Sequence, residues 1–433
     1  MNLDTQIYQQ NPQWLERTYH KPEQSWFHRP YFKKALSWLD KKLIITFTGV
    51  RRSGKSTILR QIQYFLEEKN ETENIFYFSF EKSQVKYHPE VLRDIIDWYL
   101  SFFLKKSVHM LDKKVYIFLD EIQYIPFWQD VLKSYYDQTP NIKFIISGSS
   151  SLFIKKKSLE SLAGRIVEIT IHPLHFSEYL TIKNLFINMD MTKIFKMQTQ
   201  VLTGYFEDYL RFGQFPELVK DNYTPEQAGV YLSSIEEKII EQDLPKLYKI
   251  ERIDILKLIY EFTKAHSGQV MEYKNITNDL GIDLKTTIKY FDYLNKSYLI
   301  KFCLNKMKKA VKSARTAKKI YLVSTNLSSD DIGLKVENYV FNYLHEKGHV
   351  SFFRKGNFEV DFLLTSENIL LPLEVKYQNN LEKHDYTNII KLSQKLKLNR
   401  AFIVSKNVLA ENNLEGIKIR TVPASLLEEV LTI

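Results

Sequence analysis

The sequence predicts a multidomain α/β fold built around a parallel β-sheet, and three observations lead to this prediction. Short, continuously apolar runs of strand length recur in the first 180 residues, as expected for parallel strands that are covered on both faces. One of these runs, residues 43–47, leads through a glycine-rich turn into an amphipathic stretch, residues 58–66, which is the pattern of a strand, a turn and a helix. The chain of 433 residues is too long for one compact core, so we expect two to four domains.

The glycine-rich turn is GVRRSGKST, residues 49–57, and it matches the pattern G-x-x-x-x-G-K-[ST] between a strand and a helix. Its glycines permit the backbone angles that turn successive N–H groups towards a phosphate, and the helix N-terminus adds partial positive charge. Lys55 is expected to reach the β- and γ-phosphates of ATP, and the Ser56 hydroxyl is expected to bind Mg²⁺. ATP and Mg²⁺ are therefore the expected cofactors. The predicted nucleotide-binding residues of this turn are Gly49, Arg52, Ser53, Gly54, Lys55, Ser56 and Thr57.

A second apolar run, residues 115–119, ends in two acids, Asp120 and Glu121. The carboxyl end of a parallel strand is where an open α/β sheet places its ligand. We expect Asp120 to hold Mg²⁺ through water and Glu121 to polarise the attacking water. Because two adjacent carboxylates at a buried strand end are costly without a cation or water, they favour a nucleotide site over a plain solvated turn.

Two further strands contribute candidates whose roles have alternatives. The run 143–149 ends in hydroxyls, and Ser147 either senses the γ-phosphate or only caps the strand end. Arg165 directly precedes the run 166–171 and is a candidate for reaching the transferring phosphate, either within its own subunit or from a neighbouring one. The second alternative implies a homo-oligomer.

Composition narrows the class of partner and the location of the protein. A formal net charge of +10 favours an anionic partner such as nucleic acid. The single cysteine, Cys303, excludes an internal disulfide framework and fits a reducing compartment. No N-terminal segment resembles a signal peptide and no uncharged run is long enough to span a bilayer, so we expect a cytoplasmic protein without a membrane partner.

Five motifs follow one another along the chain: the turn at 49–57, FLDEIQ at 118–123, SGS at 147–149, LAGR at 162–165 and PLHFSEY at 173–179. In this order they resemble the archaeal and bacterial AAA-type ATPase family that carries a conserved C-terminal domain of unknown function. The resemblance extends from about residue 29 to the end of the chain. It implies a P-loop ATPase core of the extended AAA+ type, a winged helix and a nuclease-like C-terminal fold.

The chain departs from this family at two places. FGQFPE, residues 212–217, has a phenylalanine where the family tends to have a second glycine. YLVSTN, residues 321–326, lacks the aspartate and glycine that the family usually carries after the corresponding strand.

The middle of the chain predicts two helical modules. The pattern over residues 183–241 is helical and suits a lid packed on the ATPase core. Residues 252–302 combine three short helices with a strand pair, which favours a winged helix. Its third helix opens with Lys285, Thr286, Thr287 and Lys289. In a winged helix that binds DNA, residues at these positions of the recognition helix contact the major groove. Alternatively, the module serves only for packing or dimerisation.

A basic stretch follows, with no acid between residues 305 and 321. Such a run is most often a solvated linker, and beside a winged helix phosphate contact is the rival interpretation. The seven cations of this stretch are Lys306, Lys308, Lys309, Lys312, Arg315, Lys318 and Lys319.

The C-terminal region brings together three acids and a lysine. The helical periodicity of residues 335–346 turns Glu337 towards the core. Alternation along residues 358–364 sets Asp361 opposite the apolar side chains, and Glu374 and Lys376 share one face of the next strand. Acids gathered in this way repel one another unless a cation binds them. The α-β-β-β-α-β order resembles the PD-(D/E)xK nuclease fold, which implies Asp361 and Glu374 as ligands of Mg²⁺ or Mn²⁺, Lys376 as the residue that activates water, and Glu337 as an assisting acid.

The predicted domains are an ATPase core with an N-terminal cap (1–180), a helical lid (181–250), a winged helix (251–304), a basic linker (305–320) and a nuclease-like domain (321–433). The first functional hypothesis is ATP hydrolysis coupled to DNA binding, extended by metal-dependent cleavage if the C-terminal acids are active. The second is an ATP-regulated switch that binds a protein partner through an inactive nuclease-like fold. The basic stretch and the complete acid set favour the first hypothesis.

Overall fold

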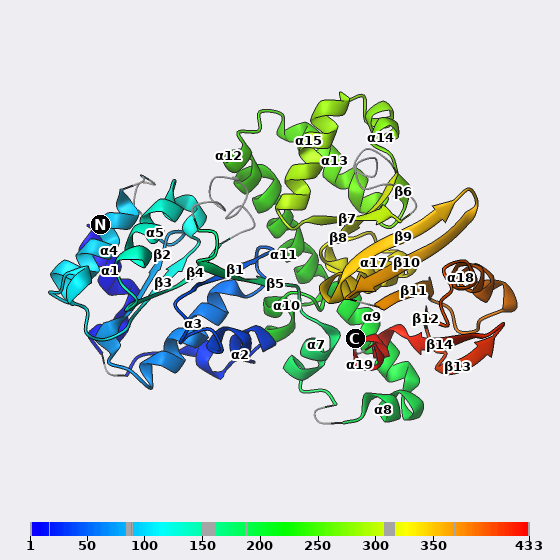
Figure 1. Ribbon diagram of the computed structural model, residues 1–433, viewed down its shortest axis with the longest axis horizontal. Helices are drawn as coiled ribbons and strands as arrows, with labels where there is room; N and C mark the ends of the chain where they lie inside the picture. The colour runs from blue at the N-terminus through cyan, green and yellow to red at the C-terminus, as the bar shows by residue number, and fades with distance from the viewer. Residues whose placement is uncertain are drawn as a thin grey trace. The chain divides into compact units, whose positions relative to one another are not determined.

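The structure is a computed structural model that describes residues 2–16, 18–83, 88, 90–148, 162–186, 189–306, 317–367 and 369–431. It divides into two compact units, unit 1 (Met1–His172) and unit 2 (Pro173–Ile433). Figure 1 shows their elements. Among the described helices, none combines the length and the apolar character that crossing a bilayer requires.

Unit 1 contains a parallel sheet whose five strands, within the described residues, have the order β2-β3-β4-β1-β5. The side chains of β1 to β4 are buried throughout, which is why their sequences are continuously apolar. The strands are β1 (Ile44–Gly49), β2 (Ile75–Ser79), β3 (Val115–Asp120), β4 (Ile142–Ser147) and β5 (Ile166–Ile171).

Helices cover both faces of this sheet, because successive side chains of a strand point to opposite sides. Ile45 and Phe47 of β1 pack on one face with α2 and α3, whereas Ile44 packs on the other face with α1, α4 and α5. The α-helices of unit 1 are α1 (Leu3–Gln10), α2 (Pro30–Leu36), α3 (Lys55–Glu67), α4 (Val91–Asp97) and α5 (Trp128–Gln138). Since all strands are parallel, β1, β3 and β4 end at the same edge, where the predicted phosphate-binding turn follows β1.

Unit 2 contains one mixed sheet, in which the described residues form nine strands in the order β13-β14-β12-β11-β10-β9-β7-β8-β6. The strands are β6 (Val270–Met271), β7 (Ile300–Asn305), β8 (Lys318–Leu322), β9 (His349–Lys355), β10 (Phe358–Ser366), β11 (Ile369–Lys376), β12 (Arg400–Ser405), β13 (Ala410–Leu414) and β14 (Ile417–Pro423). The α-helices are α7 (Phe176–Ile182), α8 (Met191–Met197), α9 (Thr199–Phe212), α10 (Pro216–Lys220), α11 (Pro225–Glu237), α12 (Leu244–Tyr248), α13 (Ile253–Ala265), α14 (Tyr273–Leu280), α15 (Leu284–Lys296), α17 (Ile332–Lys347), α18 (Lys383–Lys395) and α19 (Leu427–Val430).

The predicted α-β-β-β-α-β order of the C-terminal region is present as α17, β9, β10, β11, α18 and β12. The region predicted as a winged helix contains α13, α14 and α15 with the short strand β6 and the hairpin partners β7 and β8. Strand β7 also pairs with β9, so these strands extend the C-terminal sheet. The two regions therefore share one sheet.

The structure divides the chain differently from the predicted domain limits. The predicted lid belongs to unit 2, because Leu202, Phe206 and Tyr209 of α9 pack in one core with Tyr339 and Val340 of α17. The first unit ends at His172 and not at residue 180, because the apolar side chains of α7 enter that same core.

The structure also differs from the predicted basic linker at both ends of that segment. Asn305 closes strand β7, and Lys318 and Lys319 lie in strand β8, where both are buried. The reason is that residues 318–322 form a fully buried strand that pairs with β7 as a hairpin. Lys306 is exposed, and the remaining cations of the stretch, Lys308, Lys309, Lys312 and Arg315, lie outside the described residues.

Candidate functional site

The turn between β1 and α3 has the backbone that its two glycines were expected to allow. Gly49 has φ +135°, and a Cβ there would lie 2.2 Å from the carbonyl oxygen of Ile171. Gly54 has φ +95° and occupies the N-cap of α3. No other residue type tolerates both conditions at Gly49, so the chain keeps an open, backbone-lined turn at the helix N-terminus.

Lys55 is the first residue of α3, and its side chain is directed back along the turn. The residue is 4% exposed, and its ammonium donates hydrogen bonds to the carbonyl oxygens of Gly49 (3.2 Å) and Val50 (3.0 Å). Burial lowers the pKa of Lys55, and the charges of Glu121 and Asp120 oppose this effect. A buried ammonium whose hydrogen bonds go to carbonyl oxygens of its own turn is a natural site for a phosphate.

The remaining residues of the turn differ in their exposure to solvent. Arg52 and Ser56 are exposed and Thr57 is half-buried. The Ser53 hydroxyl is fully buried and has no hydrogen-bond partner among the described residues. Arg51 forms an ion pair with Glu81.

Asp120, at the end of β3, is held by hydroxyl groups from two neighbouring strands. Its Oδ2 accepts a hydrogen bond from the Tyr77 hydroxyl at 2.9 Å, and its Oδ1 accepts one from the Ser147 hydroxyl. Ser147 also accepts a hydrogen bond from the backbone N–H of Glu121 at 3.2 Å. The predicted sensor residue Ser147 therefore contacts both predicted acids.

Glu121 has a backbone conformation that non-glycine residues rarely adopt. Its φ is +56°, in the left-handed region, where such outliers often mark functional positions. The carboxylate accepts a hydrogen bond from the Gln123 amide. Burial raises the pKa of Glu121, which the Lys55 ammonium opposes and the charge of Asp120 reinforces. A raised pKa makes this carboxylate a better proton acceptor.

Arg29 supports the turn from the N-terminal segment, a role that the sequence did not indicate. Its guanidinium is buried and donates hydrogen bonds to the carbonyl oxygens of Ser53 and His172, both at 2.9 Å. It therefore joins the turn to the end of β5. The only local signal is an arginine directly before Pro30, which opens α2.

Arg165 lies at the opposite edge of the sheet within its own unit. Strand pairing matches Ile44 with Ile166 at the start of β1 and Gly49 with Ile171 at its end, which is roughly 16 Å further along a strand of this length. The Arg165 guanidinium donates to both carboxylate oxygens of Asp137, at 3.0 and 3.3 Å. The expectation that Arg165 reaches the phosphate of its own subunit therefore does not fit this geometry.

The residues at this edge fit a Mg²⁺-bound nucleoside triphosphate. Ser56 and Asp120 supply a hydroxyl and a carboxylate, which are the oxygen ligands that Mg²⁺ prefers. The glycine-lined turn and the unpartnered Ser53 hydroxyl offer donors to phosphate oxygens, and Lys55 supplies the positive charge.

A second group of charged residues lies in unit 2, where the four predicted nuclease residues come together. Glu337 lies on α17, Asp361 on β10, and Glu374 and Lys376 on β11. Glu374 accepts a hydrogen bond from the N–H of Asp361 at 3.2 Å and one from the Lys376 ammonium at 2.9 Å. Asp361 accepts one from the N–H of Val375 at 3.0 Å. Burial, and then the charge of Asp361, raise the pKa of Glu374 and of Glu337.

Lys319, which the sequence placed in a basic linker, lies in the middle of these acids. Its ammonium is 3.0 Å from Glu337 Oε1, 3.0 Å from Glu359 Oε1 and 3.2 Å from Asp361 Oδ1. Burial opposes the charged form of Lys319, but the three carboxylates raise its pKa well above the usual range. Among the described residues, no group of three or more acids, histidines or cysteines has the arrangement of a metal site.

The third helix of the predicted winged helix presents two of the four predicted contact residues to solvent. Lys285 and Lys289 of α15 are exposed and Thr286 is half-buried. Thr287 is buried, and its hydroxyl donates to the carbonyl oxygen of Asp283 at 3.0 Å, so it is not available to a ligand.

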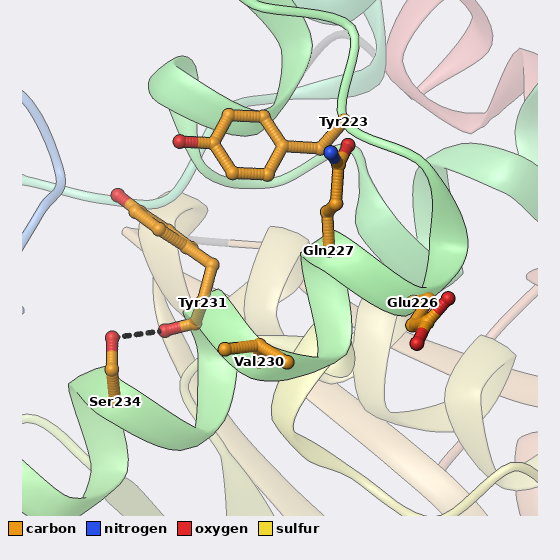
Figure 2. Close-up of a pocket in the computed structure, with 6 residues that line it drawn as sticks. All are labelled: Tyr223, Glu226, Gln227, Val230, Tyr231 and Ser234. Atoms are coloured by element: carbon orange, nitrogen blue, oxygen red, sulfur yellow. Dashed lines mark hydrogen bonds between the residues drawn. The ribbon is translucent and has the colours of Figure 1, made fainter.

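A pocket of about 560 Å³ lies beside α11, and Figure 2 shows its lining. None of the predicted site residues lines it. The dashed line in Figure 2 marks the hydrogen bond from the Ser234 hydroxyl to the carbonyl oxygen of Tyr231 (2.7 Å). The lining residues are Tyr223, Glu226, Gln227, Val230, Tyr231 and Ser234.

Comparison with known proteins agrees with this description of unit 1. Residues 41–180 match a family described as an AAA domain, residues 203–335 a domain of unknown function (DUF8612), and residues 332–424 a domain of unknown function (DUF4143). The chain is similar to the Walker-type ATPase of Pyrococcus abyssi, with 15% identity and a TM-score of 0.46, over 72% of this chain and 97% of that chain.

Two relatives extend over most of the sequence. An uncharacterized protein of Haemophilus influenzae is 25% identical over 403 residues, which are 90% of this chain and 95% of that protein. The uncharacterized protein MJ1544 of Methanocaldococcus jannaschii is 30% identical over 348 residues, which are 77% of this chain and 74% of that protein. The chain therefore belongs to the same family as MJ1544, and its unit 1 carries an AAA domain of the P-loop ATPase class.

Proposed function

We propose that this protein hydrolyses ATP at the turn 49–57 and uses the hydrolysis cycle to act on nucleic acid, with DNA as the first candidate. The observation that carries the proposal is the arrangement at the end of β3. Asp120 is fixed by the hydroxyls of Tyr77 and Ser147, and Glu121 follows it with an unusual backbone conformation. A carboxylate held by two donors keeps one orientation, which suits a residue that positions Mg²⁺.

Each residue of the site has a role in this proposal. Ser56 and Asp120 hold Mg²⁺, which neutralises the charge of the phosphates when it is bound. Lys55 leaves the carbonyls of its own turn for the β- and γ-phosphates, and Glu121 accepts the proton of the attacking water. Ser147 links the two acids and so transmits the state of the phosphate. The backbone cradle consists of Gly49, Arg52, Ser53, Gly54 and Thr57.

Arg165 acts from a neighbouring subunit in this proposal, because its own subunit's phosphate site lies at the far end of the sheet. Its ion pair with Asp137 is half-exposed, so a partner surface can reach it. This role requires a homo-oligomer. An arginine supplied in this way stabilises the charge of the transferring phosphate in the neighbour's ATP site.

Two observations support nucleic acid as the partner. The formal net charge is +10, and a strand-and-helix module of the order expected for a winged helix presents Lys285 and Lys289 from its third helix. The predicted phosphate contacts of Lys308, Lys309 and Lys312 fall outside the described residues.

The C-terminal acids have two candidate functions. In the first, Asp361 and Glu374 bind a divalent metal, with Lys376 and Glu337 assisting cleavage of nucleic acid. In the second, the nuclease-like fold cleaves nothing, and the protein is an ATP-regulated switch that binds a protein partner. The contact of Lys319 with Asp361 favours a nuclease-like fold that does not cleave nucleic acid. This holds whether the partner of the protein is nucleic acid or another protein.

The experiment that tests the proposed function compares ATP hydrolysis by the wild type, Glu121→Gln and Lys55→Ala. Glu121→Gln keeps the shape of the side chain and removes the base, so hydrolysis should fall by about a hundredfold or more while ATP binding persists. Lys55→Ala should lose both binding and hydrolysis without unfolding the protein. Hydrolysis by Glu121→Gln at the wild-type rate would contradict the assignment of the base.

The same proteins are assayed for DNA binding over a series of salt concentrations. Phosphate contacts release counterions, so affinity for DNA should fall steeply as salt rises, and DNA should change the rate of ATP hydrolysis. Affinity that does not depend on salt, or an absence of binding, would favour the protein-binding switch.

A further inference from the structure

The acid cluster of unit 2 already contains a cation, and that cation is a lysine from another part of the sheet. Lys319 lies on β8, which precedes α17 and β10 in the chain and is separated from β10 in the sheet by β9 and β7. Its side chain is 3% exposed, and its ammonium lies within 3.2 Å of carboxylate oxygens from Glu337, Glu359 and Asp361. An ammonium at this position satisfies the acids without any metal.

Three further carboxylate oxygens of the cluster accept hydrogen bonds from other donors of the protein. Asp361 Oδ2 accepts from the N–H of Val375, and Glu374 Oε2 accepts from the N–H of Asp361. Glu374 Oε1 accepts from Lys376, and Glu337 Oε1, which also contacts Lys319, accepts a second hydrogen bond from the Tyr321 hydroxyl at 2.6 Å. A divalent metal would have to displace Lys319 and compete with these donors, so the residues do not fit a metal-binding nuclease centre.

The contacts instead join two parts of unit 2. Strand β7 pairs with β9 over a short stretch, Leu304 with Ser351 and Asn305 with Phe352, so the sheet alone holds the hairpin β7–β8 weakly. Lys319 adds a charged contact from the hairpin to α17 and β10. Asn338 of α17 adds a neutral one, because its side chain bonds both the N–H (3.0 Å) and the carbonyl oxygen (2.7 Å) of Leu322 in β8.

We propose that the ammonium of Lys319 is the permanent cation of this cluster, that it excludes a divalent metal, and that the acids serve to join the hairpin β7–β8 to the C-terminal fold. Of the four residues of the nuclease motif, Glu337 and Asp361 contact Lys319 directly, and Glu374 supports this joint through the backbone N–H of Asp361. Loss of Lys319 leaves three half-buried carboxylates without this counterion, and these then form a site that a divalent cation can enter.

The proposal is tested by Mn²⁺ binding to the full chain without nucleotide, followed by the electron paramagnetic resonance signal of free Mn²⁺. The wild type and Asp361→Asn should bind the same amount of Mn²⁺. Lys319→Met should bind one additional Mn²⁺ per chain, and adding Asp361→Asn to Lys319→Met should remove it. Because nucleotide is absent, the outcome does not depend on whether unit 1 hydrolyses ATP.

Lys318→Met is the matched control, because Lys318 lies next to Lys319 in β8 and is equally buried, with its ammonium 3.8 Å from the centre of the Tyr273 ring. This variant should gain no Mn²⁺. A wild type that binds Mn²⁺ and loses it in Asp361→Asn would overturn the proposal. A folded Lys319→Met protein that gains no Mn²⁺ would also overturn it. If Lys319→Met does not fold, the comparison of the wild type with Asp361→Asn decides, since Asp361→Asn keeps the shape of the side chain and adds no charge.

Discussion

At the scale of single residues, Tyr77 is the least expected member of the proposed ATP site. It lies in the apolar strand β2, where an aromatic residue indicates only core packing. Its hydroxyl donates to Asp120 Oδ2, and the Arg60 guanidinium lies 3.3 Å from the centre of its ring. Burial, and then the charge of Asp120, raise the pKa of Tyr77 well above the usual range, so the hydroxyl stays a donor. Tyr77 is therefore a positioning residue that fixes the orientation of Asp120.

Tyr77→Phe should lower the rate of ATP hydrolysis by roughly tenfold, because one hydrogen bond to a charged group is worth on the order of 1.5 kcal/mol. The variant should also need more Mg²⁺ for half-maximal activity, while binding of ATP without Mg²⁺ stays the same. A purely structural role for Tyr77 would not shift the Mg²⁺ requirement.

The matched control is Tyr116→Phe, since Tyr116 is a buried tyrosine of the neighbouring strand β3 and packs in the same core as Tyr77. It should leave both the rate and the Mg²⁺ requirement unchanged. Equal effects in the two variants would mean that Tyr77 acts through packing and not through Asp120.

The residues that sequence could predict differ in kind from those that it could not. Gly49, Lys55, Asp120 and Glu121 have a fixed spacing around strand ends, so their chemistry can be inferred from local pattern. Lys319 contacts acids 18 and 42 residues further along the chain, and in the sequence it looks like one more charge in a basic run. Only the pairing of β8 with β7 turns its side chain to the acids.

At the scale of secondary structure elements, the two places where the sequence departs from its family turn out to be in contact. Gln214 accepts hydrogen bonds from the Ser324 hydroxyl (2.7 Å) and the Thr325 N–H (2.8 Å). Its own N–H donates to Asn326 Oδ1 at 2.8 Å, and the Asn326 amide donates to carbonyl oxygens of Tyr209 and Leu210. All of these groups are buried. The segments 212–217 and 321–326 therefore contact each other through buried hydrogen bonds, which fasten the end of α9 to the residues that follow β8.

Helix α7 is held at its start by ionised side chains from distant helices. Glu428 of α19 accepts hydrogen bonds from the N–H groups of Phe176 (2.7 Å) and Ser177 (3.0 Å), where a carboxylate stabilises a helix N-terminus. His175 Nε2 lies 3.1 Å from both carboxylate oxygens of Glu346 on α17. Burial acts to lower the pKa of His175, but the hydrogen bond and charge of Glu346, with the charges of Glu428 and Glu178, outweigh it and raise the pKa to about 9.

This pKa predicts a dependence of stability on pH that is specific to α7. The folded protein holds the His175 proton more tightly than the unfolded chain, whose histidine has a pKa near 6.5. The stabilising contribution is therefore complete below about pH 6.5 and is lost as pH rises through about 9. Urea unfolding should show the wild type losing roughly 2–3 kcal/mol over this range, and His175→Gln losing none of it.

His384→Gln is the control, because this histidine is exposed on α18 and pairs only with neighbouring acids. Its pH dependence should match that of the wild type. If the free energy of unfolding of His175→Gln still falls between pH 6.5 and 9, the titrating group is not His175.

At the scale of the whole molecule, the periodicities of the sequence predict the secondary structure elements better than the limits between domains. The strands of unit 1 and the order α17 to β12 follow from apolar runs and alternation, which are local properties. The limits between domains depend on which core each apolar face enters, and this is not a local property. The segment 173–180 shows the difference: it follows β5 without a break in pattern, yet its apolar side chains belong to unit 2.

The last prediction concerns this boundary. In the full chain Leu174, Phe176, Tyr179 and Leu180 are at most 6% exposed and pack in the core that contains Tyr339. A fragment 1–172 should bind ATP and show no aggregation by light scattering, whereas a fragment 1–180 exposes these four side chains and should bind a hydrophobic dye or aggregate.

The complementary fragments test the same boundary from the other side. Residues 173–433 should unfold cooperatively in urea, and residues 181–433 should be less stable by roughly 6 kcal/mol or more, because four large apolar side chains leave the core at about 1.5–3 kcal/mol each. Equal stability of the two longer fragments would show that α7 is not part of the core of unit 2. The boundary would then lie at residue 180, and α7 would belong with the AAA domain, whose family match extends to that residue.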